Sequence, residues 1–370
     1  MGLFHRFLCS TAAALTFAGA TAASAEPAAP LTLMGAGQLP TGAMFQGTEI
    51  GGLSGLDYDP AHDRYVAISD NRGVHGPVRF YDLTIDLSAG RLHDGAIQVH
   101  RVTTIQAADG ASFAPGVVDP ESIRTAGFPG LLYWTSEGNA RTGLAPFVRV
   151  MTKHGAPVAA FDIPAVFSPG TGHGIRNNRA FESLTRIPGT SRWVTAVENA
   201  LVQDGPAASL DTGSPVRVLT LDGTTGESGA QYVYHTEPVA AAPVPASGSA
   251  TNGLSELLAI GPGRYIALER AYSAGVSNDI RLFVTDSANA TDVRGLDTLK
   301  NAKYRAMHKH LLLDLATLPV DLDNIEALTR GPGVNGHATL ILLSDNNFNA
   351  DQRTQFIALR VDDRSLIAPQ

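Results

Sequence analysis

Short apolar runs, paired across turns, recur five times along the chain. In each copy, residues such as proline, glycine and aspartate separate two runs of mainly apolar residues. The five turns span residues 59–63, 127–130, 188–190, 261–263 and 331–333. Apolar runs joined by such turns are typical of β-hairpins. The pattern therefore predicts one hairpin element that the chain uses five times.

Acidic residues occupy fixed places in this hairpin. Glu121 opens the second copy and Glu137 closes it, and Glu182 and Glu198 do the same in the third copy, with the same step of 16 residues. The first copy keeps the step but has Ser54 in place of the first carboxylate. Because one strand of a hairpin starts beside the end of the other, we expect each pair to meet at one end. Like charges that face each other across strands are destabilising, so these pairs need protons, arginines or metal ions beside them.

Two further strand-like runs follow each of the first four hairpins. They span residues 78–87 and 97–105, 147–151 and 157–163, 216–221 and 231–235, and 280–285 and 310–315. Only one run, 355–361, follows the fifth hairpin, and segment 31–35 would supply its missing fourth strand. We therefore predict an all-β fold, a β-propeller of five four-stranded blades closed by the N-terminal strand.

Two other folds compete with this ring. A six-bladed propeller would result if the long stretch 287–307 conceals strands. A two-sheet sandwich is disfavoured, because its strands would not repeat at long regular intervals as hairpins with two acids each.

The first 25 residues have the pattern of a secretory signal. His5 and Arg6 give a short polar start, an apolar stretch follows, and residues 23–25 fit a small-residue cleavage site. The apolar stretch is shorter than the roughly 20 residues that a membrane-spanning helix needs. We expect residues 1–25 to be removed, and residues 26–370 to form a single propeller domain that is periplasmic or secreted.

Charge and cysteine content narrow the classes of function. Cys9, the only cysteine, lies in the expected signal, so the mature chain would offer neither disulfides nor thiolate chemistry. The formal net charge of -8 becomes one unit more negative when Arg6 is lost. This charge argues against nucleic acid or an anionic membrane surface as the partner, and it suits divalent cations.

The acids of the five repeats predict a metal site. The first strand of each propeller blade lines the centre, so these side chains would converge at one face. The nine expected ligands are Asp70, Glu121, Glu137, Glu182, Glu198, Glu256, Glu269, Glu326 and Asp345. So many carboxylates cannot all stay ionised without compensation. An all-oxygen set suits Ca²⁺ first, then Mg²⁺ or Mn²⁺. The alternative is that the acids accept hydrogen bonds from backbone N–H groups where strands end.

Basic residues lie close to these acids. The arginines beside them or on the loops that follow are Arg72, Arg141, Arg176, Arg179, Arg270 and Arg353. A guanidinium group pairs with phosphate or carboxylate, so these residues either bind substrate or neutralise a neighbouring glutamate. His173, on the loop 169–178, is the histidine best placed for acid–base work. The segment around Ser54 lacks the spacing of a nucleophile elbow.

Motifs within the repeats resemble those of a known family. They read Gly-Gly-Leu-Ser-Gly-Leu-Asp-Tyr-Asp, Ala-Ile-Ser-Asp-Asn-Arg, Asp-Pro-Glu-Ser-Ile, Phe-Glu-Ser-Leu, Ala-Leu-Glu-Arg, Asp-Asn-Ile-Glu-Ala-Leu and Leu-Ser-Asp-Asn-Asn-Phe. Their order over about residues 45–362 resembles the phytase-like family, described as having an esterase-like activity of phytase. The resemblance implies that the family's recurrent acidic positions fall on the nine acids above. The chain also looks like the calcium-dependent alkaline phytases, which are propellers that hold calcium over an acidic face. It lacks the Arg-His-Gly motif of the histidine acid phytases.

These features predict an exported, calcium-dependent hydrolase of phosphoesters that acts on a small phosphorylated molecule. The expected catalytic residues are Glu182, Glu198, His173 and Arg179, and the expected substrate-binding residues are Arg72, Arg141, Arg176 and Arg270. Two alternatives stay open. The same acidic ring could serve a carboxyl-esterase or lactonase, or it could hold structural calcium in a non-catalytic periplasmic binding or scaffold protein.

Overall fold

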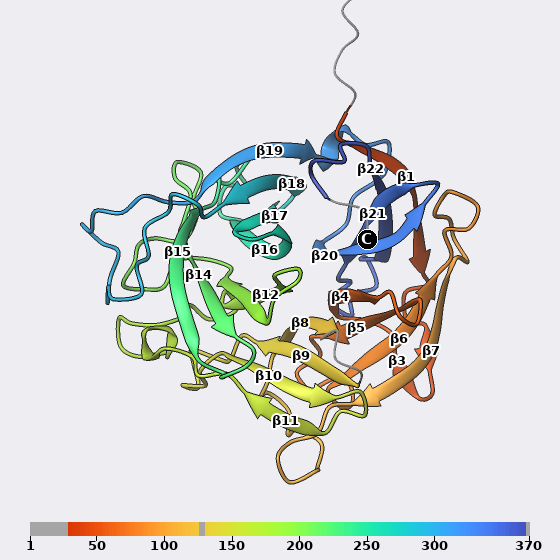
Figure 1. The fold of residues 1–370 in the computed structure, drawn as a ribbon, viewed down its shortest axis with the longest axis horizontal. Helices are drawn as coiled ribbons and strands as arrows, with labels where there is room; N and C mark the ends of the chain where they lie inside the picture. Colours follow the sequence, from red (N-terminus) through yellow and green to blue (C-terminus); the bar gives the residue numbers. More distant parts are fainter. Residues whose placement is uncertain (1–28, 126–129, 368–370) are drawn as a thin grey trace, which may run out of the picture.

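The computed structural model describes residues 29–125 and 130–367. The expected signal segment, 1–25, lies outside the described residues, as do residues 127–129 of one expected turn. Five antiparallel four-stranded sheets form a ring around a central axis (Figure 1). The prediction of a five-bladed β-propeller is therefore confirmed.

Each blade is a sheet whose first strand lies nearest the axis. The first blade contains β4 (Leu53–Asp59), β5 (Arg64–Ser69), β6 (Arg79–Ile85) and β7 (Ile97–Thr104). The second contains β8 (Pro120–Thr125), β9 (Leu131–Ser136), β10 (Phe147–Thr152) and β11 (Pro157–Ala160). The third contains β12 (Phe181–Arg186), β13 (Arg192–Val197), β14 (Pro215–Asp222) and β15 (Ser228–His235).

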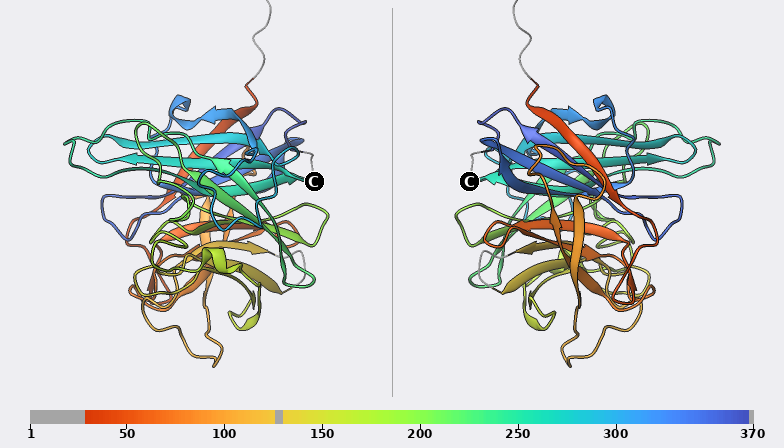
Figure 2. Two further views of the ribbon diagram at one scale, coloured as in Figure 1. Left: turned by 90° about the vertical axis from the view of Figure 1, so that its left-hand side faces the viewer. Right: turned by 90° about the vertical axis from the view of Figure 1, so that its right-hand side faces the viewer.

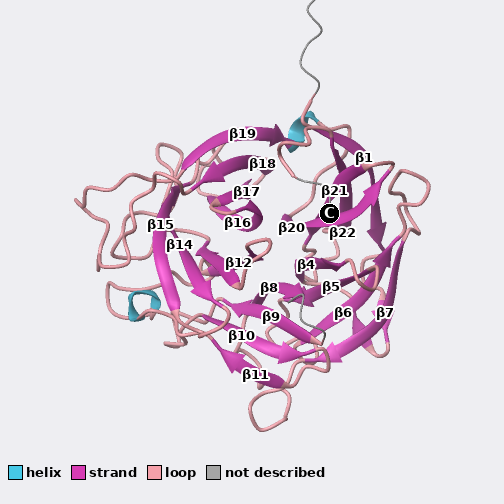
Figure 3. Cartoon of the chain, in the orientation of Figure 1, coloured by secondary structure: helices cyan, strands magenta, loops and turns pink. Residues whose placement is uncertain are grey.

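The last two blades follow the same order. The fourth contains β16 (Ala250–Gly261), β17 (Arg264–Ser273), β18 (Ser277–Asp286) and β19 (His308–Asp314). The fifth contains β20 (Ile325–Val334), β21 (His337–Ser344), β22 (Thr354–Val361) and β1 (Leu31–Leu39). Outside the blades lie β2 (Met44–Phe45), β3 (Thr48–Glu49) and the short 3-10 helices η1 (Ala165–Phe167) and η2 (Leu315–Thr317), shown in cyan in Figure 3.

The two ends of the chain close the ring. Strand β1 pairs antiparallel with β22, from Leu31 opposite Val361 to Leu39 opposite Thr354. The expected closure by the N-terminal strand is thus observed. The stretch 287–307 contains no strand, which removes the six-bladed alternative, and the ring of five sheets removes the sandwich. No helix among the described residues is long and apolar enough to cross a membrane.

The direction of the strands gives the ring two different faces. Where the structure describes them, the tight turns between the first and second strands of the blades lie at one end, which we call the hairpin face. The loops that precede each first strand and follow each second strand lie at the opposite end, which we call the loop face. The side views show loops extending beyond the strands at both ends of the ring (Figure 2). Loops held on a rigid scaffold are common places for function.

A β-bulge near the start of each innermost strand shapes the loop face. In the first blade Leu53 pairs with Ser69 and Gly55 pairs with Ile68, so Ser54 has no partner. The same shift leaves a single residue unpaired in three other blades, namely Glu182, Ser255 and Glu326. In the second blade the shift spans Glu121 and Ser122. Bulges re-aim side chains and are frequent beside functional sites.

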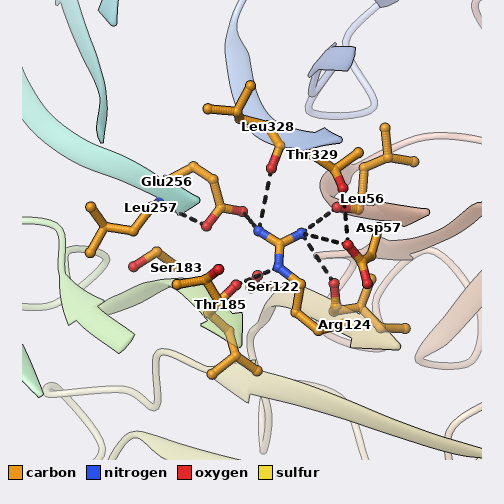
Figure 4. Close-up of polar contacts among 12 residues, drawn as sticks. Leu56, Asp57, Ser122, Arg124, Ser183, Thr185, Glu256, Leu257, Leu328 and Thr329 are labelled. Atoms are coloured by element: carbon orange, nitrogen blue, oxygen red, sulfur yellow. Dashed lines mark hydrogen bonds and ion pairs between the residues drawn. The ribbon is translucent and has the colours of Figure 1, made fainter. Parts of the chain in front are cut away.

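One arginine connects the five innermost strands at the middle of the ring. Arg124 of β8 donates hydrogen bonds to the backbone carbonyls of Leu56 in β4, Leu184 in β12 and, at 3.4 Å, Leu328 in β20. Its Nη2 atom also pairs with the Glu256 carboxylate of β16 (Figure 4). Arg124 is 3% exposed and Glu256 is 1% exposed. Arg124 therefore links its own strand, β8, to the innermost strands of the other four blades.

Candidate acidic site

The loop face brings most of the predicted acids together. A cavity of about 380 Å³ opens there. The carboxylates that line it are Asp70, Glu121, Glu182, Glu326 and Asp345. They come from four blades, because each bulge turns a first-strand residue toward the axis while the residue after each second strand lies beside it. The hairpin repeat therefore predicted this convergence.

Two groups of three carboxylates share one member. Asp119, Glu121 and Glu137 form one group, and Glu137, Glu182 and Glu198 form the other. In each group, one oxygen atom per residue lies within 4.8 Å of the others. The Oε1 atom of Glu137 accepts a hydrogen bond from the backbone N–H of Ala180, whereas its buried Oε2 atom has no partner among the described residues. Glu137 is thus placed between two possible cation positions.

Burial and mutual repulsion make these acids hard to ionise. Burial, together with the nearby Asp119, raises the pKa of Glu137 to about 8. Burial and the nearby Glu326 raise the pKa of Asp345 to about 8. The pKa values of Asp70, Glu121 and Glu182 are raised well above their ordinary range by burial first and by neighbouring carboxylates second. Protons or cations must therefore compensate this cluster.

Arginines supply part of the compensation. The Nη2 atom of Arg270 lies 3.2 Å from Glu326 and 3.7 Å from Glu198, and the Nε atom of Arg270 is buried without a partner among the described residues. Arg179 lies 3.3 Å from Glu198 and also donates to Thr251. Arg72 pairs with Asp119 at 2.6 Å. Arg72 and Arg270 line the cavity, so both can contact a molecule bound there.

Strained backbone surrounds the cavity. Of the residues that line it, Arg72, Asn178, Asn347 and Phe348 have φ angles of 53°, 56°, 48° and 51°. Residues other than glycine adopt such angles rarely and at a cost, and they cluster at functional sites. The ring of Phe348 stacks on His75, with centroids 4.1 Å apart. The stacked rings of His75 and Phe348 therefore form an aromatic wall of the cavity.

The structure does not bring Glu256 and Glu269 to this cavity. Glu256 pairs with Arg124, and Glu269 binds Tyr234, Lys309 and Asn252. The reason is the register of the fourth blade. Leu254 pairs with Glu269 before the bulge, as Phe181 pairs with Val197 in the third blade.

Ser255 and Arg270 therefore hold the two places that carry acids in the third blade. The sequence analysis assigned these two places to Glu256 and Glu269, each one residue away from the residue that occupies the place in the structure. The neighbouring acids, Glu256 and Glu269, concealed the shift.

Three other predicted site residues lie away from the described cavity lining. His173 contacts the backbone carbonyl of Ser168 at 3.1 Å. Arg176 donates to the carbonyls of Ala200 and Gly205 and so fixes the surrounding loops. Arg141 is exposed and is not part of the lining. The roles assigned to these three residues from the sequence stay predictions.

Sequence reasoning missed several residues of the site. Asp119 is 6% exposed and belongs to the first carboxylate group. Its position directly before the Pro120-Glu121 pair is a signal that could have identified it. His75, Asn178 and Phe348 line the cavity from loops and carry no comparable repeat.

Comparisons with known proteins found a matching family model and similar solved structures. A family model described as "Phytase-like: Esterase-like activity of phytase" matches residues 48–348. No curated protein matches the chain. Among solved structures, a match titled "Structure of Dos1 propeller" is 8% identical, covers 85% of this chain and 69% of that chain, and has a TM-score of 0.37.

Proposed function

Because the chain belongs to the phytase-like family, we propose that it is an exported, calcium-dependent hydrolase that cleaves phosphoesters of small molecules. The observation that carries this proposal is the pair of carboxylate groups that share Glu137 beside a cavity lined by two arginines. The signal pattern of residues 1–25 supports export.

The donor set fits a hard divalent cation. Asp119, Glu121, Glu137, Glu182 and Glu198 offer only carboxylate oxygens, which favours Ca²⁺ over metals that prefer nitrogen or sulfur. The unpartnered Oε2 atom of Glu137 and the raised pKa values of its neighbours are consistent with a cation as the missing counter-charge. Mg²⁺ and Mn²⁺ are the alternatives. When bound, such an ion supplies positive charge and makes a water molecule easier to deprotonate.

The arginines of the cavity would hold the phosphate. Arg270 lines the cavity and its side chain is 15% exposed, so its guanidinium group can contact a phosphate oxygen while it stays beside Glu326. Arg72 also lines the cavity and is held by Asp119. Charge-assisted hydrogen bonds from two guanidinium groups would fix the orientation of the ester. A carboxylate of the cluster that is not occupied by the ion would accept the proton of the attacking water.

The test is hydrolysis of four substrates by the purified protein lacking residues 1–25. A phosphomonoester, a phosphodiester, phytate and a simple carboxyl ester are each assayed after chelation and after calcium is restored. We expect phosphate release only with calcium, and its loss in the double variant Glu182→Gln/Glu198→Gln. Asp211→Asn, which changes an exposed acid, is the control and should leave the rate unchanged.

The other outcomes separate the rival functions. Cleavage of only the carboxyl ester would replace the proposal with a carboxyl-esterase. A calcium-dependent melting temperature without any turnover would replace it with a binding or scaffold protein. Full phosphate release by the double variant would show that the proposed site is wrong.

A further inference from the structure

The loop face and the hairpin face of the ring carry cavities of opposite charge. Carboxylates dominate the cavity of the loop face, whereas three arginines line a second cavity of about 210 Å³ at the hairpin face. The lining of this second cavity includes Asp57, Arg124, Thr185, Arg186, Pro188 and Arg330. Arg124, which pairs with Glu256 (Figure 4), lines the second cavity, and the linings of the two cavities share no residue. The hairpin-face cavity is therefore a separate site.

The carboxylates nearest this cavity, those of Asp57 and Glu256, already have hydrogen-bond or ion-pair partners. Asp57 Oδ2 accepts hydrogen bonds from the backbone N–H and the hydroxyl of Thr125, both at 2.8 Å. Its Oδ1 atom accepts a hydrogen bond from Thr329 at 2.9 Å and lies 3.9 Å from Arg124. Glu256 also pairs with Arg124. Both carboxylates therefore lie beside Arg124, and their negative charge compensates this arginine.

Arg330 has no such counter-charge. Among the residues that the structure describes, it forms no ion pair, and its hydrogen bond to the carbonyl of Ala259 is long, at 3.4 Å. Burial lowers the pKa of Arg330, as expected for a cation that lacks a carboxylate partner. A partly buried charge without compensation is costly unless a ligand supplies the opposite charge.

Neighbouring groups add donors around the same space. Arg186 lines the cavity and donates from Nε to the carbonyl of Thr190 at 2.8 Å, which fixes the direction of its guanidinium group. The Oγ1 atom of Thr185 accepts a hydrogen bond from the N–H of Ala259, so its own hydroxyl proton can be donated to a ligand. Guanidinium and hydroxyl donors around a small cavity suit a tetrahedral oxyanion.

We propose that the hairpin-face cavity binds a phosphate group, with Arg330 as its main partner and Arg186 and Thr185 as additional donors. The volume of about 210 Å³ is several times the roughly 30 Å³ occupied by one water molecule, so a phosphate or a small phosphomonoester fits. The site does not depend on the acidic cavity, and it binds without a metal ion.

Calorimetric titration of the chelated protein tests this site. Inorganic phosphate and glycerol phosphate are used in separate experiments, which distinguishes free phosphate from an esterified phosphate. We expect binding by the native protein and equal binding by Glu182→Gln/Glu198→Gln, because the acidic cavity is not involved. Arg330→Gln should weaken binding at least tenfold, and Arg330→Lys should give an intermediate affinity because it keeps the charge without the planar fork.

The control is Arg264→Gln, which removes an exposed arginine from another hairpin of the same face. It should bind phosphate as the native protein does. The proposal is wrong if the native protein does not bind either ligand, or if Arg330→Gln and Arg330→Lys both bind with native affinity. These results are independent of hydrolysis, so failure here leaves the proposed function untouched.

Discussion

Arg270 lies in the fourth blade at the place that Glu198 occupies in the third, and its Nη2 atom is 3.7 Å from Oε1 of Glu198. The same nitrogen lies 3.2 Å from Oε1 of Glu326 in the fifth blade. One blade therefore contributes a cation where the others contribute anions. Arg270 therefore lets Glu198 and Glu326 approach one another. The net negative charge of the site is smaller than it would be if the fourth blade also had an acid at this place.

Removing this internal cation should destabilise the chelated protein. Among the described residues, Arg270→Gln leaves Glu326 without an ion pair and Glu198 with Arg179 alone. We expect a loss of about 3 kcal/mol in the free energy of unfolding, the size typical of breaking a buried ion pair. Calcium should reduce the difference, because an ion can take over the compensation. Urea unfolding with chelator and with calcium measures both effects, and Arg270→Lys is the control that keeps the charge.

The stability of the chelated protein should fall as the pH rises from 5 to 8. Burial first, and neighbouring acids second, raise the pKa values of Glu137 and Asp345 to about 8 in the folded state. The unfolded chain releases these protons near its ordinary values of 4.5 and 3.8. Between those limits the folded state binds more protons, so a rise in pH favours unfolding.

Melting temperatures across this pH range check the expectation. The slope should be steep with chelator, shallow with saturating calcium, and reduced in Glu137→Gln. A chelated protein that melts at the same temperature at pH 5 and pH 8 would contradict the raised pKa values.

The repeated hairpin made the fold predictable. Turn residues, apolar runs and the short fifth blade indicated five blades and their closure by residues 31–35, and the observed strand β1 spans Leu31–Leu39. These features are local in sequence. Each follows from backbone geometry and from the alternation of apolar and polar residues.

The site was predictable only where the repeat is regular. Seven of the nine expected acids lie in the carboxylate groups or along the cavity. Glu256 and Glu269 do not, because the fourth blade has its bulge at Ser255 and the sequence offers acids one residue to either side of the true places. The central role of Arg124 was not predictable either, since it joins carbonyl groups from strands far apart in the sequence.

Loss of Arg124 should weaken the whole ring. Arg124→Met leaves Glu256 buried without its partner and frees the carbonyls of Leu56 and Leu184. We expect a decrease of about 3–5 kcal/mol in the free energy of unfolding. The double variant Arg124→Met/Glu256→Met should recover part of this loss, because it leaves no unpaired charge in the centre.

Urea unfolding with a constant m value measures these effects of Arg124. Arg192→Gln, an exposed change on another blade, is the control and should be neutral. A double variant less stable than Arg124→Met would contradict the assignment of the cost to the unpaired Glu256.

Gly52 should be required for the acidic site. Its φ angle is 61°, and a Cβ atom there would lie 2.2 Å from Oδ1 of Asp70 and 2.5 Å from Cε2 of Phe348. Gly52→Ala must therefore displace a carboxylate and the aromatic wall together, and we expect a lower melting temperature and at least tenfold weaker calcium binding in calorimetric titration. Gly47→Ala is the matched control, because its φ angle is 82° but no atom lies within 4 Å of the added Cβ. It should show the backbone cost of about 1 kcal/mol and native calcium affinity. Equal calcium affinities for the two variants would mean that Asp70 and Phe348 do not shape the calcium site.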